Sequence, residues 1–394
     1  MDRIPPLQIF LVFLRLGLTS FGGPVAHLGY FHRTLIVNRR WLDEQSYAEL
    51  IGLCQFLPGP SSSQVGLAIG LAKGGWFGAI AAWAGFTLPS AALMTAIGLG
   101  VHYFGSAVPQ WLIHGLILVA VPIVAQAVWL MARQLCPDWR RRLLAAAAAA
   151  ILVIVSTAFA QPLVIAAGGL IGSFALAKRS SLSVNASPPR RHRRMALLLL
   201  SLFFLLLLLL PAADRAFHNH ALSVFSAFYR AGALVFGGGH VVLPLLQSAV
   251  VPPGWVTGAD FLAGYGAAQA MPGPLFSFAA YLGAVMAAPP TGIVGGLLCL
   301  IAIYVPSFLL VIGALPLWEA IRHRPGIRGA VAGINAVVVG LLAAALYRPV
   351  LTSAIHVPAD LVMAVAGLVL LIMFKVPSWT VVLLTIAASG LMLR

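Results

Sequence analysis

The chain has few charged residues. Only 8% of its 394 residues are Asp, Glu, Lys or Arg, whereas soluble domains carry roughly 25%. Hydrophobic residues make up 61% of the chain, and several apolar runs approach or exceed the ~20 residues that a membrane-spanning helix needs. The ten-residue alternation of a membrane β-barrel is missing from the sequence, and backbone groups within lipid must be paired internally. The sequence therefore predicts an all-α polytopic membrane protein.

The chain also lacks the signatures of enzymes and of metal sites. It has three cysteines without a CxxC spacing, so the sequence suggests neither a disulfide framework nor a metal site. HExxH, GxSxG and P-loop sequences are absent from it. Without a nucleotide-binding motif, primary active transport by this chain alone is disfavoured. We expect a protein that is not an enzyme and that uses neither cofactor nor metal.

Acidic residues are scarce, since 9 acidic residues face 24 basic ones, for a net charge of +15. In a soluble protein such an excess would indicate nucleic acid. Here most of the basic residues lie in short loops between apolar segments, so we expect no nucleic-acid partner. The excess is typical of positive-inside anchoring and of attraction to anionic lipid headgroups. A general preference for an anionic cargo is the alternative. The basic loops are residues 33–40, 133–142, 178–194 and 322–328.

The apolar segments form two similar series on either side of the basic, proline-containing linker 178–194. Pro58-Gly59-Pro60 returns as Pro272-Gly273-Pro274, and Phe21-Gly22-Gly23 returns as Phe236-Gly237-Gly238. An ordered series of such residues indicates duplication. Internal repeats with interrupted segments at corresponding positions are typical of secondary transporters. The predicted divisions are a first repeat at 1–177, the linker with a connecting transmembrane helix at 178–219, and a second repeat at 220–394.

The orientation of the two repeats is less clear from the sequence. The loop after the first Phe-Gly-Gly carries Arg33, Arg39 and Arg40, whereas its counterpart 240–257 carries no Lys or Arg, which favours inverted repeats. If each Pro-Gly-Pro segment is a re-entrant hairpin, each half has five spans and the repeats are parallel. If each is a discontinuous span, each half has six and the repeats are inverted, but two basic loops then face opposite sides. We favour inversion, with roughly 11–13 membrane segments.

The Pro-Gly-Pro breaks are the first candidate for a binding site. Proline lacks an N–H and pushes its predecessor out of the α region, so one helix should end near Leu57 and another begin after Pro60. Hydroxyl and amide donors would then stand at a helix N-terminus, which favours anions. A merely kinked transmembrane helix is the alternative. The candidate residues at the breaks are Gln55, Pro58, Gly59, Pro60, Ser61, Ser62, Ser63, Gln64, Gln269, Pro272, Gly273, Pro274 and Ser277.

Two arginines and two glycine turns extend this candidate site. Arg15 and Arg230 lie inside apolar segments at equivalent repeat positions. Because a central Arg costs about 2.5–3.5 kcal/mol on insertion, we expect both to face the bundle interior and offset the charge of the cargo. Snorkelling to an interface is the alternative. The glycine turns permit positive φ or close backbone approach and precede two histidines. The turns and histidines add Gly22, Gly23, His27, Gly237, Gly238 and His240 to the candidate binding residues.

Three acidic residues precede the first break, and the second half lacks them. A carboxylate entering a membrane segment is a candidate proton carrier, because burial raises its pKa. Asp43 and Glu44 stand where a helix N-terminus favours negative charge, so capping is the alternative for both. Glu49 lies one turn further inside and is the preferred candidate for proton coupling.

With these residues identified, the chain resembles the long-chain, two-domain type of the chromate ion transporter family over nearly its full length. The most specific segments are Phe21–His27, Trp41–Leu50, Cys54–Val65, Phe236–His240 and Gln269–Pro274. The resemblance implies export of chromate across the bacterial inner (cytoplasmic) membrane, driven by protons, which confers chromate resistance. It implies chromate and protons as partners within a lipid bilayer, sulfate as a competitor, and leaves a homodimer open.

Two other functions stay open. Uptake or exchange of sulfate or another oxyanion would use the same scaffold. An intramembrane enzyme acting on lipid phosphates would also use Arg and helix N-termini, but it should need paired acids or a metal site. The second half offers little for this purpose beyond Asp260. We therefore predict a secondary transporter of a divalent oxyanion.

Overall fold

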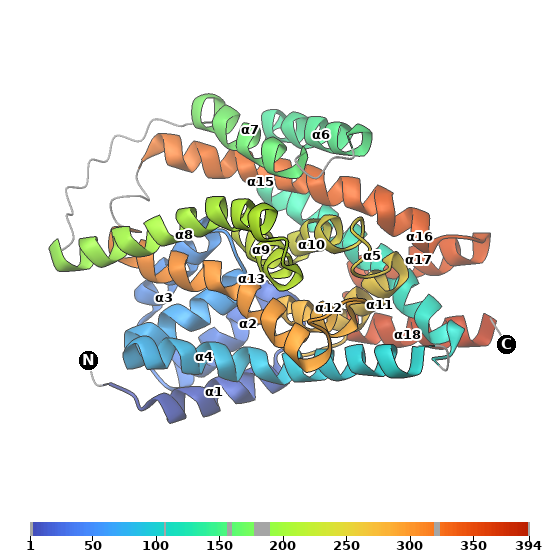
Figure 1. Ribbon diagram of the computed structural model, residues 1–394, viewed down its shortest axis with the longest axis horizontal. Coiled ribbons are helices and arrows are strands. Elements are labelled where there is room, and N and C mark those ends of the chain that lie inside the picture. The colour runs from blue at the N-terminus through green and yellow to red at the C-terminus, as the bar shows by residue number, and fades with distance from the viewer. Residues whose placement is uncertain (1–2, 106–107, 156–159, 177–189, 319–323, 393–394) are drawn as a thin grey trace.

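The computed structural model describes residues 3–105, 108–155, 160–176, 190–318 and 324–392 (Figure 1). Within these ranges all regular structure is helical, which confirms the predicted all-α class. Five of the described helices are long and apolar enough to cross a membrane, and six shorter apolar helices accompany them. The chain is thus a multi-pass membrane protein, as its composition predicted.

The two halves contain the same order of helices, and α8 (Arg190–Phe217) connects them. The first half comprises α1 (Pro6–Thr19), α2 (Gly23–Phe31), the π-helical turn η1 (His32–Asn38), α3 (Glu44–Phe56), α4 (Ser61–Phe104), α5 (Gln110–Leu135), α6 (Trp139–Ile154) and α7 (Ala160–Ala175). The second half comprises α9 (His220–Leu234), η3 (Gly239–Val241), α10 (Val242–Val250), α11 (Gly258–Gln269), η4 (Leu275–Ser277), α12 (Phe278–Val285), α13 (Gly292–Ala314), η5 (Leu315–Leu317), α15 (Pro325–Ala345), η6 (Leu346–Leu351), α16 (Thr352–Ala354), α17 (Pro358–Ile372) and α18 (Ser378–Met392).

The Pro-Gly-Pro segment of the second half is a re-entrant hairpin. The hydroxyl of Tyr281 on α12 donates to the carbonyl of Asp260 on α11 at 2.9 Å, and the N–H of Ala287 donates to the carbonyl of Trp255 at 3.0 Å. These two bonds join the end of α12 to the start of α11. The chain therefore enters and leaves this segment on the same side.

The Phe-Gly-Gly turn of the first half also reverses the chain. The rings of Phe13 on α1 and Phe31 on α2 pack edge to face with centroids 5.5 Å apart. Nearer the turn, Gly17 on α1 and His27 on α2 both pack against Phe86. Since α1 has only 14 residues, or about 21 Å, it forms one arm of a hairpin with α2 and does not cross a ~30 Å membrane core alone.

From the sequence alone, inverted repeats placed two basic loops on opposite sides of the membrane. The reversal of the chain between α1 and α2 removes this conflict. Pro89 of α4 corresponds to Pro306 of α13, which makes these two helices equivalent. Leu99 packs beside Gly292, whereas Ala79 belongs to one hydrophobic cluster with Ile312. The two equivalent helices therefore run antiparallel, as in inverted repeats. Neither count of spans made from the sequence included the hairpin of α1 and α2.

A glycine divides α4 into two segments. Gly75 has φ +62° and ψ −153°, so residues 61–74 form the second arm of the first-half hairpin and 76–104 form the following span. In the second half, the corresponding segments are α12 and α13, and residues 286–291 separate them. Glycine at this position permits a reversal that a side chain would disfavour.

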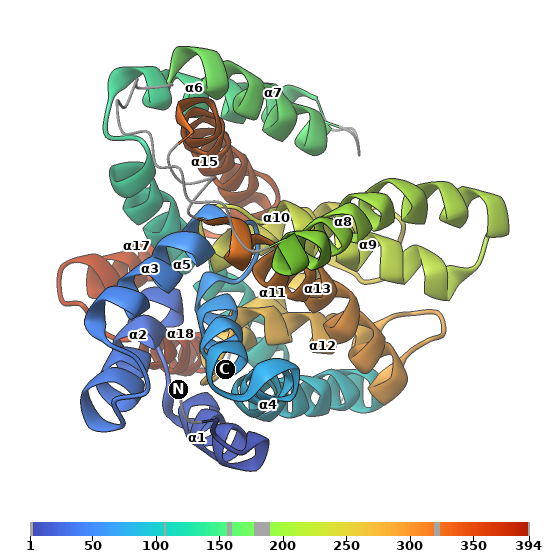
Figure 2. The same ribbon diagram turned by 90° about the vertical axis from the view of Figure 1, so that its left-hand side faces the viewer.

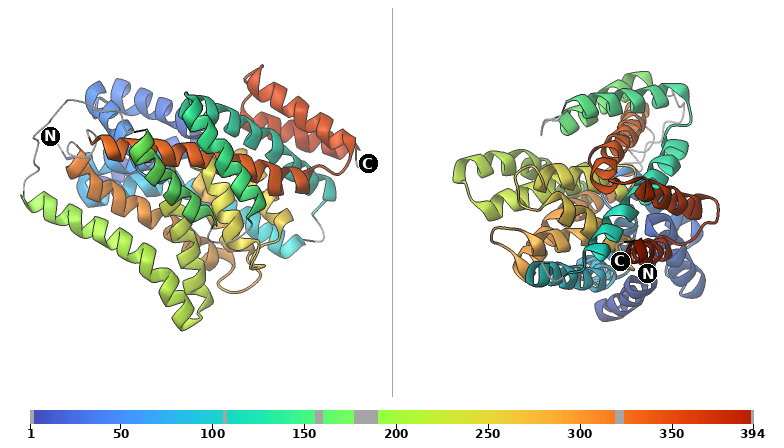
Figure 3. Two further views of the ribbon diagram at one scale, coloured as in Figure 1. Left: turned by 90° about the horizontal axis from the view of Figure 1, so that it is seen from above. Right: turned by 90° about the vertical axis from the view of Figure 1, so that its right-hand side faces the viewer.

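The terminal helices of each half pack on the other half. Helices α6 and α7 cover α15, while α17 and α18 cover α5. Figures 2 and 3 show α6, α7 and α15 together along one side of the molecule. Close backbone approach supports this exchange, since Gly172 of α7 meets Gly333 of α15, and Gly115 of α5 meets Ile386 of α18. Small residues allow helices to pack tightly within a membrane.

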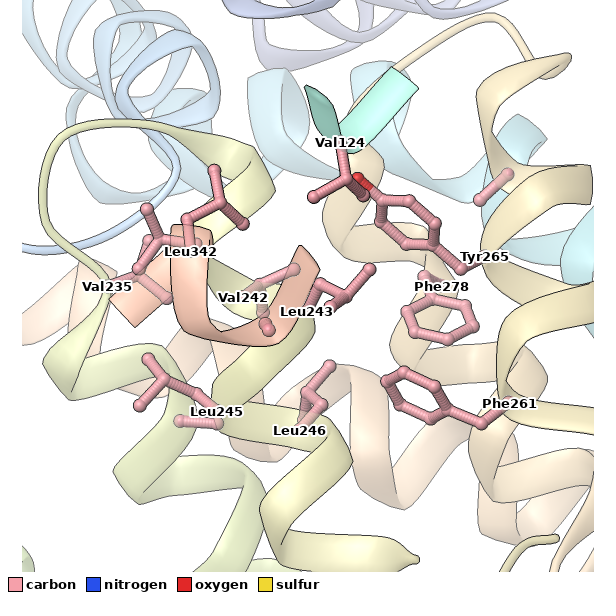
Figure 4. Close-up of a cluster of buried hydrophobic side chains, with 14 of the residues drawn as sticks. Val124, Val235, Val242, Leu243, Leu245, Leu246, Phe261, Tyr265, Phe278 and Leu342 are labelled. Atoms are coloured by element: carbon pink, nitrogen blue, oxygen red, sulfur yellow. The ribbon is translucent and has the colours of Figure 1, made fainter. Parts of the chain in front are cut away.

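The largest hydrophobic cluster lies between the halves. Figure 4 shows Val124 of α5, Leu243 of α10, Tyr265 of α11 and Phe278 of α12 converging, with Leu342 of α15 nearby. Five helices from both halves thus share one core. The interface between the halves is consequently built from rigid elements of both.

Several helix ends that carry basic residues lie at one end of the molecule. In Figure 1 the N-terminus, the start of α8, the end of α13 and the start of α15 all lie to the left. At this end Arg140 of α6 donates from Nη1 to the carbonyl of Ala175 at 3.4 Å, and the rings of Phe56 and Trp318 lie 5.5 Å apart. We refer to this end as the basic end.

Candidate functional site

A cavity of about 590 Å³ lies between the halves, where the glycine turns and the Pro-Gly-Pro breaks meet. We call it the central cavity. Among the described residues, its lining includes no Lys, Arg, Asp or Glu, and its one histidine is His240. The polar and glycine residues that line it are Gly22, Gly23, Gln55, Gly59, Ser61, Gln126, Gln134, Gly237, Gly238, Gly239, His240, Gln269, Asn335 and Ser378.

Two reciprocal backbone hydrogen bonds hold the breaks in place. The N–H of Gly59 donates to the carbonyl of Val235 at 2.7 Å, and the N–H of Gly273 donates to the carbonyl of Ser20 at 2.8 Å. Val235 and Ser20 each precede a Phe-Gly-Gly turn. The break of each half is therefore bound to the glycine turn of the other half, and one half alone cannot form this arrangement.

Three helix N-termini open on the central cavity. Helix α2 begins after Gly22, which has φ +98°, the η3–α10 helix begins after Gly238, which has φ +144°, and α4 begins at Ser61. In none of the three does a side chain cap the first turn. Because the first N–H groups of a helix have no partner within it, three sets of donors with partial positive charge are available to a ligand.

Amide side chains supply further donors. Gln134 comes from α5, Gln55 and Gln269 come from the ends of α3 and α11, and Asn335 comes from α15. Gln126 of α5 also lines the cavity, but its Nε2 already donates to the carbonyl of Leu371 at 3.2 Å. Nε2 of Gln269 is buried without a hydrogen-bond partner among the described residues. A buried donor of this kind needs a partner, and a ligand in the cavity can supply it.

Of the three serines at the first break, only Ser61 lines the cavity. Ser62 lies 3.2 Å from Nδ1 of the buried His27, and Ser63 lies 3.3 Å from the hydroxyl of Tyr304. Their hydroxyls therefore face protein groups. We infer that Ser62, Ser63 and His27 support the start of α4 from behind.

The remaining break residues shape the chain around the cavity. Gln64 donates from Nε2 to the carbonyl of Pro58 at 2.6 Å, and Ser277 donates to the carbonyl of Pro274 at 2.8 Å. His240, in contrast, lines the cavity and places Nδ1 2.9 Å from the hydroxyl of Tyr265. The predicted residues at the breaks that lie outside the cavity lining are Pro58, Pro60, Ser62, Ser63, Gln64, Pro272, Gly273, Pro274 and Ser277.

The two arginines expected to offset the charge of the cargo lie outside the cavity lining. Arg15 is exposed on α1. Arg230 is partly buried on α9, where the charges that act on it are those of Asp214 and Arg215 near the end of α8. The structure brings neither guanidinium group to the central cavity.

The acidic candidates lie outside the cavity as well. Asp43 caps α3, because it accepts from the N–H of Ser46 at 2.7 Å and from its hydroxyl at 3.1 Å. These bonds lower the pKa of Asp43, and they confirm the capping interpretation. Glu44 binds Nε2 of His32 at 2.9 Å.

Glu49 accepts a hydrogen bond from Gln45 at 3.3 Å, one helical turn earlier on α3. Its side chain is half-buried. Glu49 is thus the most enclosed of the three acidic candidates.

Sequence reasoning missed the polar residues on α5 and α15. Ile123, Gln126, Leu130 and Gln134 all line the cavity and are separated by three or four residues, so they share one face of α5. Amides in an otherwise apolar spanning helix were the available signal. Asn335 on α15 gives the same signal from the second half.

Comparisons with known proteins agree with this duplicated architecture. A family model described as "Chromate transporter" matches residues 7–173 and again residues 222–391. The first segment falls on α1–α7 and the second on α9–α18. No solved structure matches the chain significantly.

Curated relatives cover most of the chain. A "Chromate transport protein" of Pseudomonas aeruginosa is 28% identical over 86% of this chain and 80% of the relative. A "Chromate transport protein" of Cupriavidus metallidurans is 27% identical over 98% of this chain and 92% of the relative. An uncharacterized transporter of Bacillus subtilis is 27% identical over 34% of this chain and 72% of its own length. The similarity thus extends to a shorter transporter that one half can match.

Proposed function

Because this chain belongs to the chromate transporter family, we propose that it carries chromate across the membrane and binds the dianion in the central cavity. The relatives named as chromate transport proteins support the substrate. One observation supports this location for the binding site. Three uncapped helix N-termini converge on one cavity between the two halves.

A tetrahedral dianion requires many donors and few acceptors. The cavity offers backbone N–H groups at Gly23, Ser61 and Gly239 together with amide side chains. Helix N-termini carry partial positive charge, so they stabilise an anion without a formal countercharge. A neutral site of this kind also releases its ligand more easily than one with several arginines, which suits a transporter.

The other predicted site residues have supporting roles in this proposal. Pro58, Pro60, Pro272 and Pro274 end the helices at the breaks. Arg15 and Arg230 contribute to charge compensation from outside the cavity. Each break belongs to one half and is held by the other, so alternating access would proceed by movement of the halves around a shared centre.

We assign export as the direction and the bacterial inner membrane as the location. Arg193 and Arg194 at the start of α8 and Arg324 and Arg328 at the start of α15 lie at the basic end, and by the positive-inside rule this end faces the cytoplasm. Protons provide the driving force in this proposal, and Glu49 is the proton carrier because it is half-buried on a helix that leads to the cavity. Export of chromate would confer resistance.

Sulfate transport is the second candidate. Sulfate is a tetrahedral dianion like chromate. A cavity lined by hydrogen-bond donors recognises charge and shape, which the two ions share. The lining therefore predicts competition between the two ions. Sulfate added in excess should inhibit chromate transport.

Chromate accumulation in cells tests the function. Cells that express the chain should accumulate less chromate and survive it better than cells that express an equally abundant Gly59→Ala variant. In everted vesicles, an imposed proton gradient should drive chromate inward. Equal accumulation in both strains contradicts export, and greater accumulation with the wild-type chain indicates uptake.

A further inference from the structure

A second cavity of about 290 Å³ adjoins the central cavity at the basic end. Gln134 and Leu135 of α5 and Asn335 of α15 line both cavities, so the two communicate through one set of side chains. We call the second cavity the vestibule. Its lining includes two arginines, Arg141 of α6 and Arg328 of α15, whereas the lining of the central cavity includes none.

The two vestibule arginines come from different halves, and carboxylates neutralise them only in part. Nε of Arg141 lies 3.2 Å from Oδ2 of Asp138, but the geometry leaves this buried Nε without a hydrogen bond. Arg328 is exposed and forms no ion pair with any described residue. Like charges thus face one cavity without a carboxylate in its lining.

The neighbouring arginines are engaged differently. Arg142 donates from Nε to the carbonyl of Cys136 at 3.1 Å and from Nη2 to that of Pro137 at 3.4 Å. Arg140 donates to the carbonyl of Ala175. Both guanidinium groups therefore stabilise the turn between α5 and α6 or the end of α7. Neither of them lines the vestibule.

At the opposite end of the molecule, the equivalent positions hold a histidine and an aspartate in place of the two arginines. Arg141 and Asp360 are each the third residue of equivalent helices, α6 and α17. His114 and Arg328 are also equivalent, since they lie 214 residues apart, which is the offset of the repeat. Gly115, after His114, packs on α18, and Gly329, after Arg328, packs on the equivalent helix α7. His114 Nε2 lies 3.2 Å from Oδ1 of Asp360, and its Nδ1 lies 2.9 Å from the hydroxyl of Ser389.

One end therefore holds a histidine in contact with a buried carboxylate, and the other holds two arginines at the equivalent positions. Two guanidinium groups that share a cavity repel one another unless an anion lies between them. Planar guanidinium groups bind oxyanions through paired N–H donors. The vestibule thus has the charge, the donors and the connection to the central cavity that an anion entering from this end requires.

We propose that Arg141 and Arg328 form a second oxyanion subsite, which captures a tetrahedral dianion and passes it to the central cavity by way of Gln134 and Asn335. The identity of the transported dianion as chromate rests on the proposed function. The phosphate of an anionic lipid headgroup has the same chemistry, and the experiment distinguishes the two sources.

Transport by purified protein in vesicles of zwitterionic lipid tests the subsite. Arg141→Gln and Arg328→Gln should each raise the KM for chromate about fivefold to tenfold with kcat changed less than twofold, because a charge-assisted contact is lost from capture only. Arg140→Gln and Arg324→Gln remove the same charge from the same helix ends outside the vestibule. These two controls should change KM less than twofold.

The remaining outcomes decide against the subsite. Equal KM increases in all four variants would show a general surface charge effect, and an unchanged KM in both vestibule variants would show that the arginines do not contact the ion. If the vestibule variants differ from wild type only when phosphatidylglycerol is added to the vesicles, a lipid headgroup is the occupant and the proposal fails.

A binding measurement separates this proposal from the function itself. Sulfate and chromate should each raise the thermal unfolding temperature of the detergent-purified wild-type protein, and the increase should shrink in Arg328→Gln but not in Arg324→Gln. A wild-type protein that is stabilised by these ions but does not transport chromate would contradict the proposed function and leave the subsite supported. If the Gln variants express poorly, Arg141→Lys and Arg328→Lys keep the positive charge but lose the paired N–H donors, so they should still raise the KM, though less than the Gln variants.

Discussion

Of the two glycines at the breaks, Gly59 and Gly273, replacement of Gly59 by alanine should disrupt the central cavity more. Gly59 has φ +128°, and a Cβ there would overlap Nε2 of Gln64 and lie 2.7 Å from Oγ of Ser307. The overlap displaces the Gln64 amide from the carbonyl of Pro58, to which it donates at 2.6 Å. The N–H of Gly59 also holds the first break to Val235 of the second half.

The expected free-energy cost combines two effects. An L-residue at this φ costs about 1–3 kcal/mol, and the lost hydrogen bond of Gln64 costs about 0.5–1.5 kcal/mol. The sum of about 2–4 kcal/mol lowers the population of the native break about 30-fold to 1,000-fold, since 1.4 kcal/mol corresponds to a factor of ten. Because the spanning helices and the core at the interface are unaffected, the protein should still insert and fold.

Transport and folding should therefore respond differently to Gly59→Ala. We expect chromate transport by vesicles to fall at least tenfold, while the amount of protein in the membrane stays within twofold of wild type. Gly254→Ala is the matched control, since Gly254 has φ +76° in the turn after α10 and its Cβ would meet no atom within 4 Å. Wild-type transport by Gly59→Ala, or an equal loss in Gly254→Ala, would refute the reasoning.

Three further predictions concern single polar groups. Gln269→Leu removes a buried, unpartnered amide from the cavity lining and should raise the KM for chromate about threefold to tenfold with little change in thermal stability. Asp360→Ala leaves a histidine without its buried partner, so the free energy of unfolding in detergent should fall by about 3 kcal/mol. Glu49→Gln should abolish the dependence of transport on the proton gradient, which a vesicle flux assay measures. Asp43→Asn should keep that dependence, because the bonds from Ser46 lower the pKa of Asp43, and the stabilisation they give is present above its unperturbed pKa and lost only as pH falls below the usual carboxyl range.

Proline and glycine made the breaks predictable from the sequence. Proline restricts φ and removes a donor whatever surrounds it, so α3 ends at Phe56 and α4 begins at Ser61, as Pro58 and Pro60 predicted. The repeated order of these residues also identified equivalent positions in the two halves. The cross-bonds of Gly59 and Gly273 join those positions across the interface.

The fold of the first hairpin was not predictable from hydropathy. Residues 6–21 are apolar enough to resemble a span, but α1 ends at Thr19 and the glycine turn sends α2 back along it. An apolar run reports that a segment is buried in lipid or protein, and it does not report where the chain turns. From the sequence, the Phe-Gly-Gly turn predicts positive φ or close backbone approach, and in the structure Gly22 has φ +98° and the turn also starts α2 at the cavity.

The positions of the charged side chains depended on packing that the sequence does not encode locally. Arg15 and Arg328 are both basic residues in or beside apolar segments, and both are exposed. Of these two, only Arg328 lies beside a cavity that shares lining residues with the central cavity, because α7 and α6 of the other half cover α15. The exchange of terminal helices between halves therefore decides which arginine can meet an anion.

Under the proposed function, inverted duplication would let one site serve two sides of a membrane with different chemistry. The centre is shared, since each break is bound to the turn of the other half, and a change at Gly59 or Gly273 affects both. The ends are independent, because Arg141 with Arg328 and His114 with Asp360 occupy equivalent positions without touching the same cavity. Residues at the ends can thus change charge while the centre keeps its donors. A preference for capture from one side then follows from the ends alone, and exchanging their charges should reverse it without altering which anion is bound.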